Sequence, residues 1–141
     1  EVRLINGHST EALSASDAAV VCSGTSTLQT ALLARPMVVV YRVSWLSYLL
    51  LRRLVKVAHI ALVNLIAGKR LVPELVQQSF TAVNVRNEIR DILQHPTKTR
   101  VLVQELHDIR ALLGQGKTAY RVADSLKRYI PSTLRGSERR Q

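Results

Sequence analysis

The residues best suited to hold an anion are five consecutive small ones, Ser23 to Thr27, with the sequence SGTST. Four hydroxyl side chains can donate hydrogen bonds to a phosphate or cap a helix, and the glycine lets a ligand approach the backbone closely. A helix that begins here would add unpaired amides facing the same anion. The segment therefore predicts either an anion-binding turn or a plain helix cap, and it matches no phosphate-loop or dinucleotide fingerprint that would name the ligand.

A strand, a helix and a second strand must position this turn. Ala18–Cys22 and Met37–Val40 are short apolar runs of the kind that form strands buried on both faces of a parallel sheet. Between them, apolar residues recur at helical spacing until Pro36 ends the pattern. Units of this type bind ligands beyond the carboxyl end of the first strand, which is where the turn lies.

The pattern outside this unit predicts one α/β domain that ends in helices. An apolar fraction of 47% in 141 residues is enough for a core. Further strands are predicted at Val2–Ile5 and His59–Val63, and helices at Ser9–Ala15, Ser44–Val57, Val72–Gln77, Val83–Leu93, Thr97–Leu113 and Lys117–Ile130. We therefore expect a parallel sheet with flanking helices over residues 1–80, further helices of the same domain over 81–130, and a disordered basic tail over 131–141.

The charge of the chain is strongly basic and unevenly distributed. The net charge is +10, and no acidic residue occurs from Ala18 through Pro73. The basic residues of this interval are Arg35, Arg42, Arg52, Arg53, Lys56, Lys69 and Arg70. Their field favours nucleotide phosphates, anionic lipid headgroups or nucleic acid as partners. Nucleic acid is not expected, because aromatic residues are only 4% of the chain and no nucleic-acid motif is present.

Cysteine and histidine usage predicts neither a metal site nor a cofactor. The single cysteine, Cys22, allows no internal disulfide and no cysteine-based zinc site, and its place in an apolar run predicts a small buried side chain. His8, His59, His95 and His107 fall on different predicted elements, without the spacing or acidic neighbours of a metal site. We find no catalytic constellation in this sequence.

The segment from Trp45 to Lys56 combines large apolar residues with a basic end. It is too short to span a bilayer, because Arg52 and Arg53 interrupt it well before the ~20 apolar residues that a span needs. It is either an interfacial segment or an apolar crossover helix that covers the sheet. The membrane-contact candidates are Trp45, Leu46, Leu49, Leu50, Arg52, Arg53 and Lys56.

Two more polar residues stand where ligands often bind. Asn64 follows a predicted apolar strand and offers a donor and an acceptor together. Glu74 falls in the first turn of a predicted helix and can accept hydrogen bonds from sugar hydroxyls. The alternatives are that Asn64 is a turn residue and that Glu74 complements the helix dipole.

Several motifs occur in one order along residues 15–78. They are Ser23-Gly24-Thr25 with Thr27-Leu28, Arg35-Pro36-Met37-Val38-Val39 followed by Tyr41-Arg42, Val63-Asn64-Leu65-Ile66-Ala67-Gly68, and Val72-Pro73-Glu74-Leu75-Val76-Gln77. This series resembles the lipid-A-disaccharide synthase family, membrane-associated glycosyltransferases of the GT-B type with two Rossmann-like domains. The sequence departs from the family pattern at Gln29, where Glu is usual, and at Val63, where Pro is usual.

The resemblance implies that the chain is the carboxy-terminal, Rossmann-like part of such an enzyme. The implied reaction moves 2,3-diacylglucosamine from UDP to 2,3-diacylglucosamine 1-phosphate with inversion, forming the β-1,6 lipid A disaccharide and UDP. The catalytic base is expected in a missing amino-terminal domain, so this portion alone should be inactive. The implied UDP-sugar site comprises Ser23, Gly24, Thr25, Ser26, Thr27, Gln29, Arg42, Asn64, Glu74 and Gln77.

The same resemblance implies the partners and the location. The expected partners are the two acylated sugar substrates, the amino-terminal domain, the anionic surface of the inner membrane and a second copy of the chain in a homodimer. The expected location is cytoplasmic and peripheral, on the inner face of the cytoplasmic membrane. The alternatives are another UDP-sugar transferase or epimerase, or a non-catalytic basic module that binds anionic membrane or nucleic acid.

Overall fold

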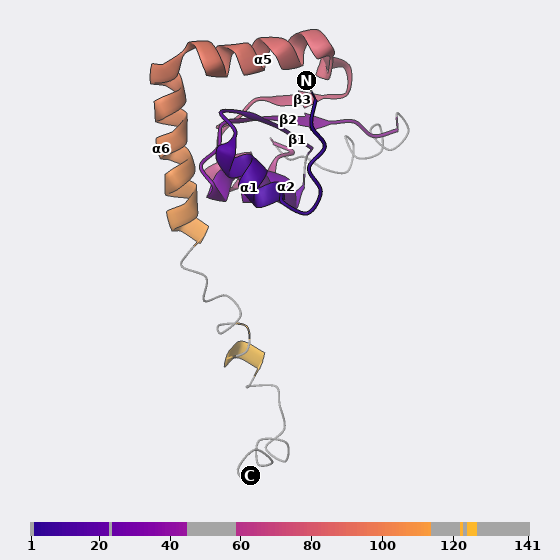
Figure 1. Cartoon of the computed structure of the whole chain (residues 1–141). Helices are drawn as coiled ribbons and strands as arrows, with labels where there is room; N and C mark the ends of the chain where they lie inside the picture. Colours follow the sequence, from indigo (N-terminus) through magenta and orange to yellow (C-terminus); the bar gives the residue numbers. More distant parts are fainter. Residues whose placement is uncertain (1, 23, 45–58, 114–121, 123, 127–141) are drawn as a thin grey trace.

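A parallel sheet of three strands lies at the centre of the molecule (Figure 1). The computed structural model describes residues 2–22, 24–44, 59–113, 122 and 124–126. Within these residues the sheet has the order β1 (Ala19–Cys22), β2 (Met37–Tyr41) and β3 (Glu74–Val76). Because all three strands are parallel, their carboxyl ends share one edge of the sheet, which we call the carboxyl edge.

Helices cover both faces of the sheet. They are α1 (Ser9–Ala15), α2 (Thr25–Leu32), α4 (Leu62–Ala67), the 3₁₀ helix η1 (Gln77–Ser79), α5 (Ala82–Gln94) and α6 (Pro96–Leu113). Figure 1 shows α5 on one side of the sheet and α1 and α2 on the other, with α6 running along one end. The α/β fold class predicted from the sequence is therefore confirmed.

The central strand β2 supplies side chains to two hydrophobic cores. Met37 and Val39 pack into the core that α2, α4 and α6 close, together with Leu106 of α6. Val38 and Val40 point to the opposite core, which contains Ile92 of α5. Successive residues of a strand face opposite sides, so an unbroken apolar run suits a strand that is covered on both faces. The strand predicted over Met37–Val40 is confirmed by β2.

The outer strand β1 differs from the prediction in its burial. Val21 faces the core, whereas the Val20 side chain is half-exposed and Cys22 is exposed. The expectation that Ala18–Cys22 is buried on both faces, and that Cys22 is a buried side chain, is therefore wrong. β1 lies at the edge of the described sheet, and Val20 is not among the residues packed in the core that contains Ile92 of α5.

Two elements between β2 and α5 were assigned the wrong type. The strand predicted over His59–Val63 is wrong, because α4 begins at Leu62 and includes Asn64. A short apolar run does not by itself distinguish a strand from a buried helix, and here Gly68, at φ +66°, ends a helix. The helix predicted over Val72–Gln77 is also wrong, because its centre pairs with β2 as β3. Pro73 lies just before that strand, where a missing amide costs nothing, and its carbonyl accepts from Val39 N at 2.9 Å.

The remaining predicted elements fall into three groups. The helices α1, α2, α5 and α6 confirm the predicted helical segments. The strand predicted over Val2–Ile5 is wrong, since these residues are exposed coil without a pairing strand in the described part of the chain. The helix predicted over Ser44–Val57, apart from Ser44, and the tail over 131–141 lie outside the described residues. Of the helix predicted over Lys117–Ile130, only residues 122 and 124–126 are described, and these are helical. Among the helices that are described, none is both long and apolar enough to cross a membrane.

Candidate functional site

The turn between β1 and α2 presents hydroxyl groups to solvent at the carboxyl edge. Gly24 is the N-cap of α2 and has φ +144°, a backbone conformation that favours glycine. Thr25 and Ser26 are exposed in the first turn of the helix, and no side chain of the described residues caps it. Ser23 lies outside the described residues. A helix start with exposed hydroxyls, at which the N-cap glycine offers no side chain, is able to receive an anion.

Not every hydroxyl of this turn is available to a ligand. Thr27 is fully buried, and its Oγ1 donates to the carbonyl of Gly24 at 2.7 Å. Ser26 Oγ donates to the carbonyl of Cys22 at 3.2 Å, but the side chain remains exposed. Gln29, one turn further along α2, is exposed and donates from Nε2 to Thr10 Oγ1 of α1 at 3.0 Å. The structure thus separates an internal brace, Thr27, from groups that face solvent.

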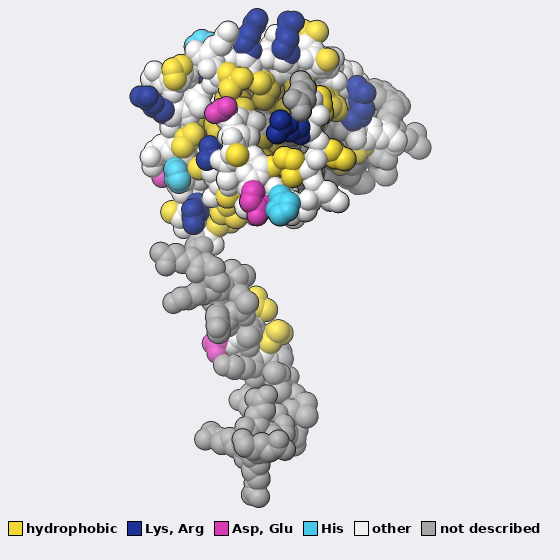
Figure 2. All heavy atoms as spheres, viewed as in Figure 1, with side chains coloured by type: hydrophobic (Ala, Val, Ile, Leu, Met, Phe, Trp, Pro, Cys, Tyr) yellow, Lys and Arg dark blue, Asp and Glu magenta, His cyan; other side chains and the backbone are white. Residues whose placement is uncertain are grey.

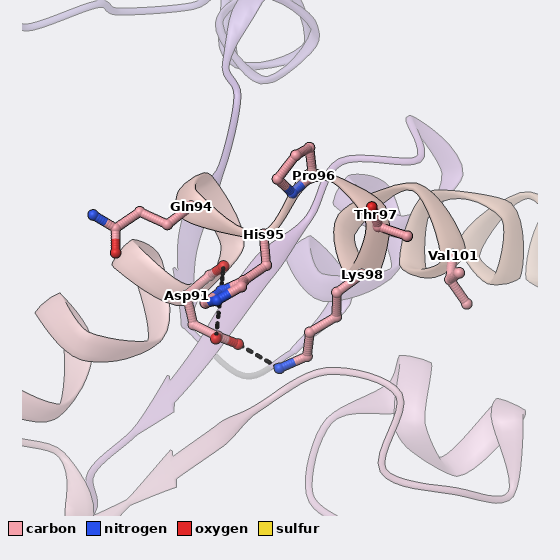
Figure 3. A pocket seen from close by; sticks show the side chains of 7 residues that line it. All are labelled: Asp91, Gln94, His95, Pro96, Thr97, Lys98 and Val101. Atoms are coloured by element: carbon pink, nitrogen blue, oxygen red, sulfur yellow. Dashed lines mark hydrogen bonds and ion pairs between the residues drawn. The ribbon is translucent and has the colours of Figure 1, made fainter.

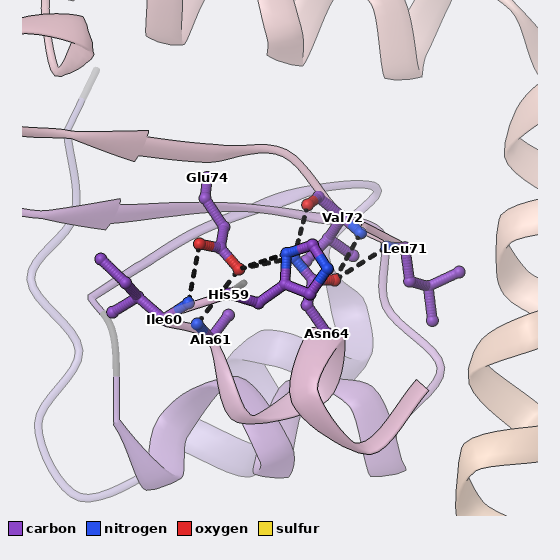
Figure 4. Close-up of polar contacts among 7 residues, drawn as sticks. All are labelled: His59, Ile60, Ala61, Asn64, Leu71, Val72 and Glu74. Carbon is purple, nitrogen blue, oxygen red and sulfur yellow. Dashed lines mark hydrogen bonds and ion pairs between the residues drawn. The ribbon is translucent and has the colours of Figure 1, made fainter. Parts of the chain in front are cut away.

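Asn64 lies at the centre of a buried polar network between α4 and β3 (Figure 4). Its side chain has no solvent exposure, and Nδ2 donates to the carbonyl of Val72 at 2.9 Å and to Glu74 Oε1 at 2.7 Å. Its Oδ1 accepts from Leu71 N and Val72 N, both at 2.9 Å. Every donor and acceptor position of the amide is therefore used within the protein.

Glu74 extends this network from β3 to the start of α4. Its Oε2 accepts from Ile60 N at 2.9 Å, and its Oε1 accepts from Ala61 N at 3.1 Å. His59 Nδ1 lies 3.9 Å from Glu74 Oε1, and both side chains are mostly buried. The carboxylate thus satisfies amides at the beginning of α4, which is the favourable position for a negative charge on a helix. This agrees with the helix-dipole alternative, although the helix is α4 and not one that contains Glu74.

Gln77 and Arg42 lie where β3 and β2 end. Gln77 is buried, with φ +52°, and its side-chain amide pairs with the backbone of Val43: Val43 N donates to Oε1 at 3.0 Å and Nε2 donates to Val43 O at 3.1 Å. The exposed Arg42 donates from Nη2 to the carbonyl of Phe80 at 3.4 Å, and its guanidinium lies 5.5 Å from the centre of the Phe80 ring. The guanidinium of Arg42 is therefore held against Phe80 and remains exposed to an anion.

A second polar cluster, at the junction of α5 and α6, was missed by the sequence analysis (Figure 3). His95 Nδ1 lies 2.9 Å from Asp91 Oδ1, and Lys98 donates a short hydrogen bond to Asp91 Oδ2. The expectation for the histidines concerned the spacing and acidic neighbours of a metal site and did not consider a single Asp–His pair, for which the four-residue spacing of Asp91 and His95 was the available signal. The cluster borders an open hollow of about 630 Å³.

The pair of Asp91 and Lys98 shifts the titration of both groups. The hydrogen bond from Lys98 holds the pKa of the Asp91 carboxyl below its usual value of 3.8, and the nearby positive charges act in the same direction. The same hydrogen bond raises the pKa of Lys98 above its usual 10.5. Both side chains are exposed, so we interpret the cluster as a surface ion pair at a helix junction.

The electrostatic character of the surface agrees with an anionic ligand. Lysine and arginine side chains are spread over the face shown in Figure 2, with few acidic side chains between them. Within the described residues, no group of three or more histidine, cysteine, aspartate or glutamate side chains is arranged to hold a metal ion. At the carboxyl edge, Thr25, Ser26 and Arg42 are exposed polar groups that an anion could contact.

Comparison with known proteins places these features in a family. The profile of the family described as lipid-A-disaccharide synthetase matches residues 1–126. The chain is 46% identical over 126 residues to the lipid-A-disaccharide synthase of Anaeromyxobacter dehalogenans strain 2CP-C, covering 89% of this chain and 33% of that protein. It is 48% identical over 122 residues to the enzyme of the same name from Syntrophus aciditrophicus, covering 86% of this chain and 32% of the relative. The chain thus spans about a third of the length of these relatives.

Proposed function

The chain belongs to the lipid-A-disaccharide synthetase family, glycosyltransferases of lipid A biosynthesis, and we propose that it is the nucleotide-binding portion of such an enzyme. The proposed reaction transfers 2,3-diacylglucosamine from UDP to 2,3-diacylglucosamine 1-phosphate. The acceptor hydroxyl oxygen attacks the anomeric carbon, the bond from that carbon to UDP breaks, and the hydroxyl proton passes to a base. Because the chain spans a third of its relatives, we place the base and the acceptor site in a domain outside it.

The observation that carries this proposal is the turn at the carboxyl end of β1. Gly24 leaves the backbone open, Thr25 and Ser26 are exposed, and α2 begins without a side-chain cap among the described residues. As UDP departs, negative charge develops on its phosphates, and fixed amides and hydroxyls stabilise that charge without reorganisation. Arg42 adds a positive charge at the same edge of the sheet. We therefore assign the diphosphate of the donor to this turn, which includes Ser23.

The other predicted site residues have less direct support for ligand contact. Asn64, Glu74 and Gln77 are assigned to donor binding by the family resemblance, but their described polar contacts are with the protein itself. Thr27 braces the turn, and the exposed Gln29 is close enough to α1 to bond Thr10. We propose that Asn64, Glu74, Gln77 and Thr27 shape the donor site, and that Gln29 makes neutral hydrogen bonds where the family resemblance implies a Glu.

We also propose that the enzyme works at the anionic inner surface of the cytoplasmic membrane as a peripheral protein. Both proposed substrates carry acyl chains, and the segment from Trp45 to Lys56 combines apolar and basic residues suited to a headgroup layer. The net charge of +10 favours the same surface. The predicted contact residues lie outside the described residues, so their sequence and the charge of the chain support this part of the proposal.

Titration calorimetry with UDP tests the proposal directly. We expect the chain to bind UDP, and Thr25→Ala to weaken binding by about tenfold, as for a lost hydrogen bond to a charged group. Thr97→Ala, which removes an exposed threonine at the start of α6, is the matched control and should leave the affinity unchanged. A folded chain that does not bind UDP, or whose affinity is the same in Thr25→Ala, would contradict the proposal. Salt-sensitive binding to bare nucleic acid without any UDP effect would instead support a basic module.

A further inference from the structure

The side chain of Arg42 is held by an aromatic ring and a backbone carbonyl that both belong to Phe80. The guanidinium carbon lies 5.5 Å from the centre of the Phe80 ring, and Nη2 donates to the Phe80 carbonyl at 3.4 Å. A cation within about 6 Å of a ring centre is attracted by the electrons of the ring face. One residue therefore contacts the guanidinium in two ways, through its side chain and through its backbone.

These contacts hold a cation without neutralising it. Lys69 and Lys98 are held instead by carboxylates, those of Glu105 and Asp91. Within the described part of the chain, Arg42 forms no ion pair with an acidic side chain. A neutral ring and a carbonyl leave the full positive charge, and most of the N–H donors of the guanidinium, to an incoming anion.

The turn that carries Phe80 is itself fixed by hydrogen bonds. Val76 N donates to Ser79 Oγ at 2.7 Å, and the same hydroxyl donates to the carbonyl of Val76 at 2.8 Å. Asn84 Nδ2 donates to the carbonyl of Ser79 at 2.8 Å. The Phe80 side chain packs, partly buried, against the core on the α5 side of the sheet. The ring is therefore a fixed contact surface for the longer and more flexible arginine side chain.

Arg42 lies at the carboxyl edge, beside the strand that leads into the α2 turn. It is the first residue after β2, and Cys22, the last residue of β1, pairs with Val40. The two chains therefore leave the sheet at nearly the same level, one into Gly24 and α2, the other into Arg42. Phe80 follows β3 and η1, on the opposite side of β2 from β1. A ligand that extends from the α2 turn across the end of β2 would approach the guanidinium that Phe80 holds there.

We propose that Phe80 is a positioning residue that holds the charged guanidinium of Arg42 at the donor site and does not itself contact the nucleotide. The inference rests on the proposed function, in which Arg42 contributes positive charge to the site of the diphosphate. A free arginine side chain loses rotamer freedom when a ligand fixes it, and a side chain that is already held loses less. Without the ring, the diphosphate should therefore bind less tightly.

Two substitutions at Phe80 separate the ring from the apolar contact with the core. Phe80→Leu keeps an apolar side chain and removes the ring face, whereas Phe80→Tyr keeps the ring. Arg42→Ala removes the guanidinium, and its combination with Phe80→Leu shows whether the ring acts through the arginine. Val85→Ala is the matched control, because Val85 of α5 is partly buried against the same core. Thermal unfolding of each variant establishes that it is folded.

Calorimetric titration of the 141-residue chain with UDP provides the test. We expect Phe80→Leu to weaken UDP binding about two- to fivefold, as for the loss of an exposed contact between a cation and a ring. Phe80→Tyr and Val85→Ala should leave the affinity within about 1.5-fold, because both retain the ring and the guanidinium. Arg42→Ala should itself weaken binding, and adding Phe80→Leu to it should have no further effect. Uridine, which lacks the diphosphate, should bind the unmodified chain and Phe80→Leu equally.

The outcomes separate this inference from the function on which it rests. If the unmodified chain binds UDP and Phe80→Leu binds it as tightly or more tightly, the inference is overturned and the donor site stands. If Phe80→Leu weakens binding equally with and without Arg42, the ring does not act through the arginine, and the inference is again wrong. If Thr25→Ala weakens binding and Arg42→Ala does not, the anion is held without Arg42, which overturns the inference alone. If the folded chain does not bind UDP, the proposed function fails and the inference fails with it.

Discussion

The α2 turn and the α4–β3 network are both polar, yet the protein uses them in opposite ways. In the turn, Thr25 and Ser26 are exposed at a helix start that no described side chain caps. In the network, Asn64 and Glu74 are enclosed and bonded to backbone amides and carbonyls. Polar residues at the edge of a sheet therefore have two uses. Those whose hydrogen bonds are completed inside the protein hold the scaffold, and those left open to solvent are able to bind a ligand.

The strongest test of the comparison is to remove the centre of the network. Asn64→Ala leaves the amides of Leu71 and Val72 and the carbonyl of Val72 without their partner in a buried place. We expect the free energy of unfolding to fall by about 3 kcal/mol or more, measured by urea denaturation. The control Asn87→Ala removes an exposed asparagine and should cost less than about 0.5 kcal/mol. A small effect at Asn64 would show that the network is not part of the scaffold.

The two threonines of the turn sharpen the comparison within one segment. Thr27→Val keeps the buried volume but removes the hydrogen bond to the Gly24 carbonyl, and we expect it to cost about 1 kcal/mol of stability. Thr25→Val changes an exposed side chain and should leave the stability nearly unchanged while UDP affinity falls. Denaturation and calorimetry on both variants provide the measurement. If the two variants lost the same amount of stability and the same amount of UDP affinity, Thr27 would not be a structural residue distinct from a ligand-binding Thr25.

The reactivity of Cys22, which directly precedes this turn, provides a test of ligand binding at the turn. Because the thiol is exposed in the native chain, a water-soluble disulfide reagent should modify it without prior unfolding. UDP bound at the adjacent turn should slow this modification several-fold, and uridine, which lacks the diphosphate, serves as the control. Modification that requires denaturant would contradict the exposure of Cys22. Modification that UDP leaves unaffected would place the ligand elsewhere.

The smallest expected effect concerns the exposed cluster of α5 and α6. Lys98→Ala should return the pKa of Asp91 toward its usual 3.8, observed by NMR titration of the carboxyl group, whereas Lys69→Ala should leave it unchanged. Because the pKa of Asp91 is lower in the folded chain, its carboxylate stabilises the fold at pH values above 3.8. This contribution is lost as the pH falls through the lowered pKa. The ammonium of Lys98 stabilises the fold fully at pH values below 10.5, and this contribution is lost as the pH rises through the raised pKa of Lys98. An unshifted Asp91 in the unmodified chain would argue against the pair.

The sequence by itself determined those helices and strands whose hydrophobic pattern fits only one type of secondary structure. An unbroken β-branched run gave β2, and apolar residues at helical spacing gave α5 and α6. The ordered motifs also led to the family, which the comparisons confirm. The glycine turn before α2 was likewise visible, because glycine and hydroxyl residues have a local reason to occur at a helix start.

Only the tertiary structure decided the types of α4 and β3 and the roles of their polar residues. Whether the short run around Glu74 becomes a helix or a strand depends on pairing with β2, which is a contact across the chain. The burial of Asn64 and the exposure of Cys22 have the same origin, since one is enclosed by β3 and the other lies on the outer strand. Hydrogen bonds between distant residues, such as Gln77 with Val43, carry no local sequence signal. They become visible only when the fold brings the two segments together.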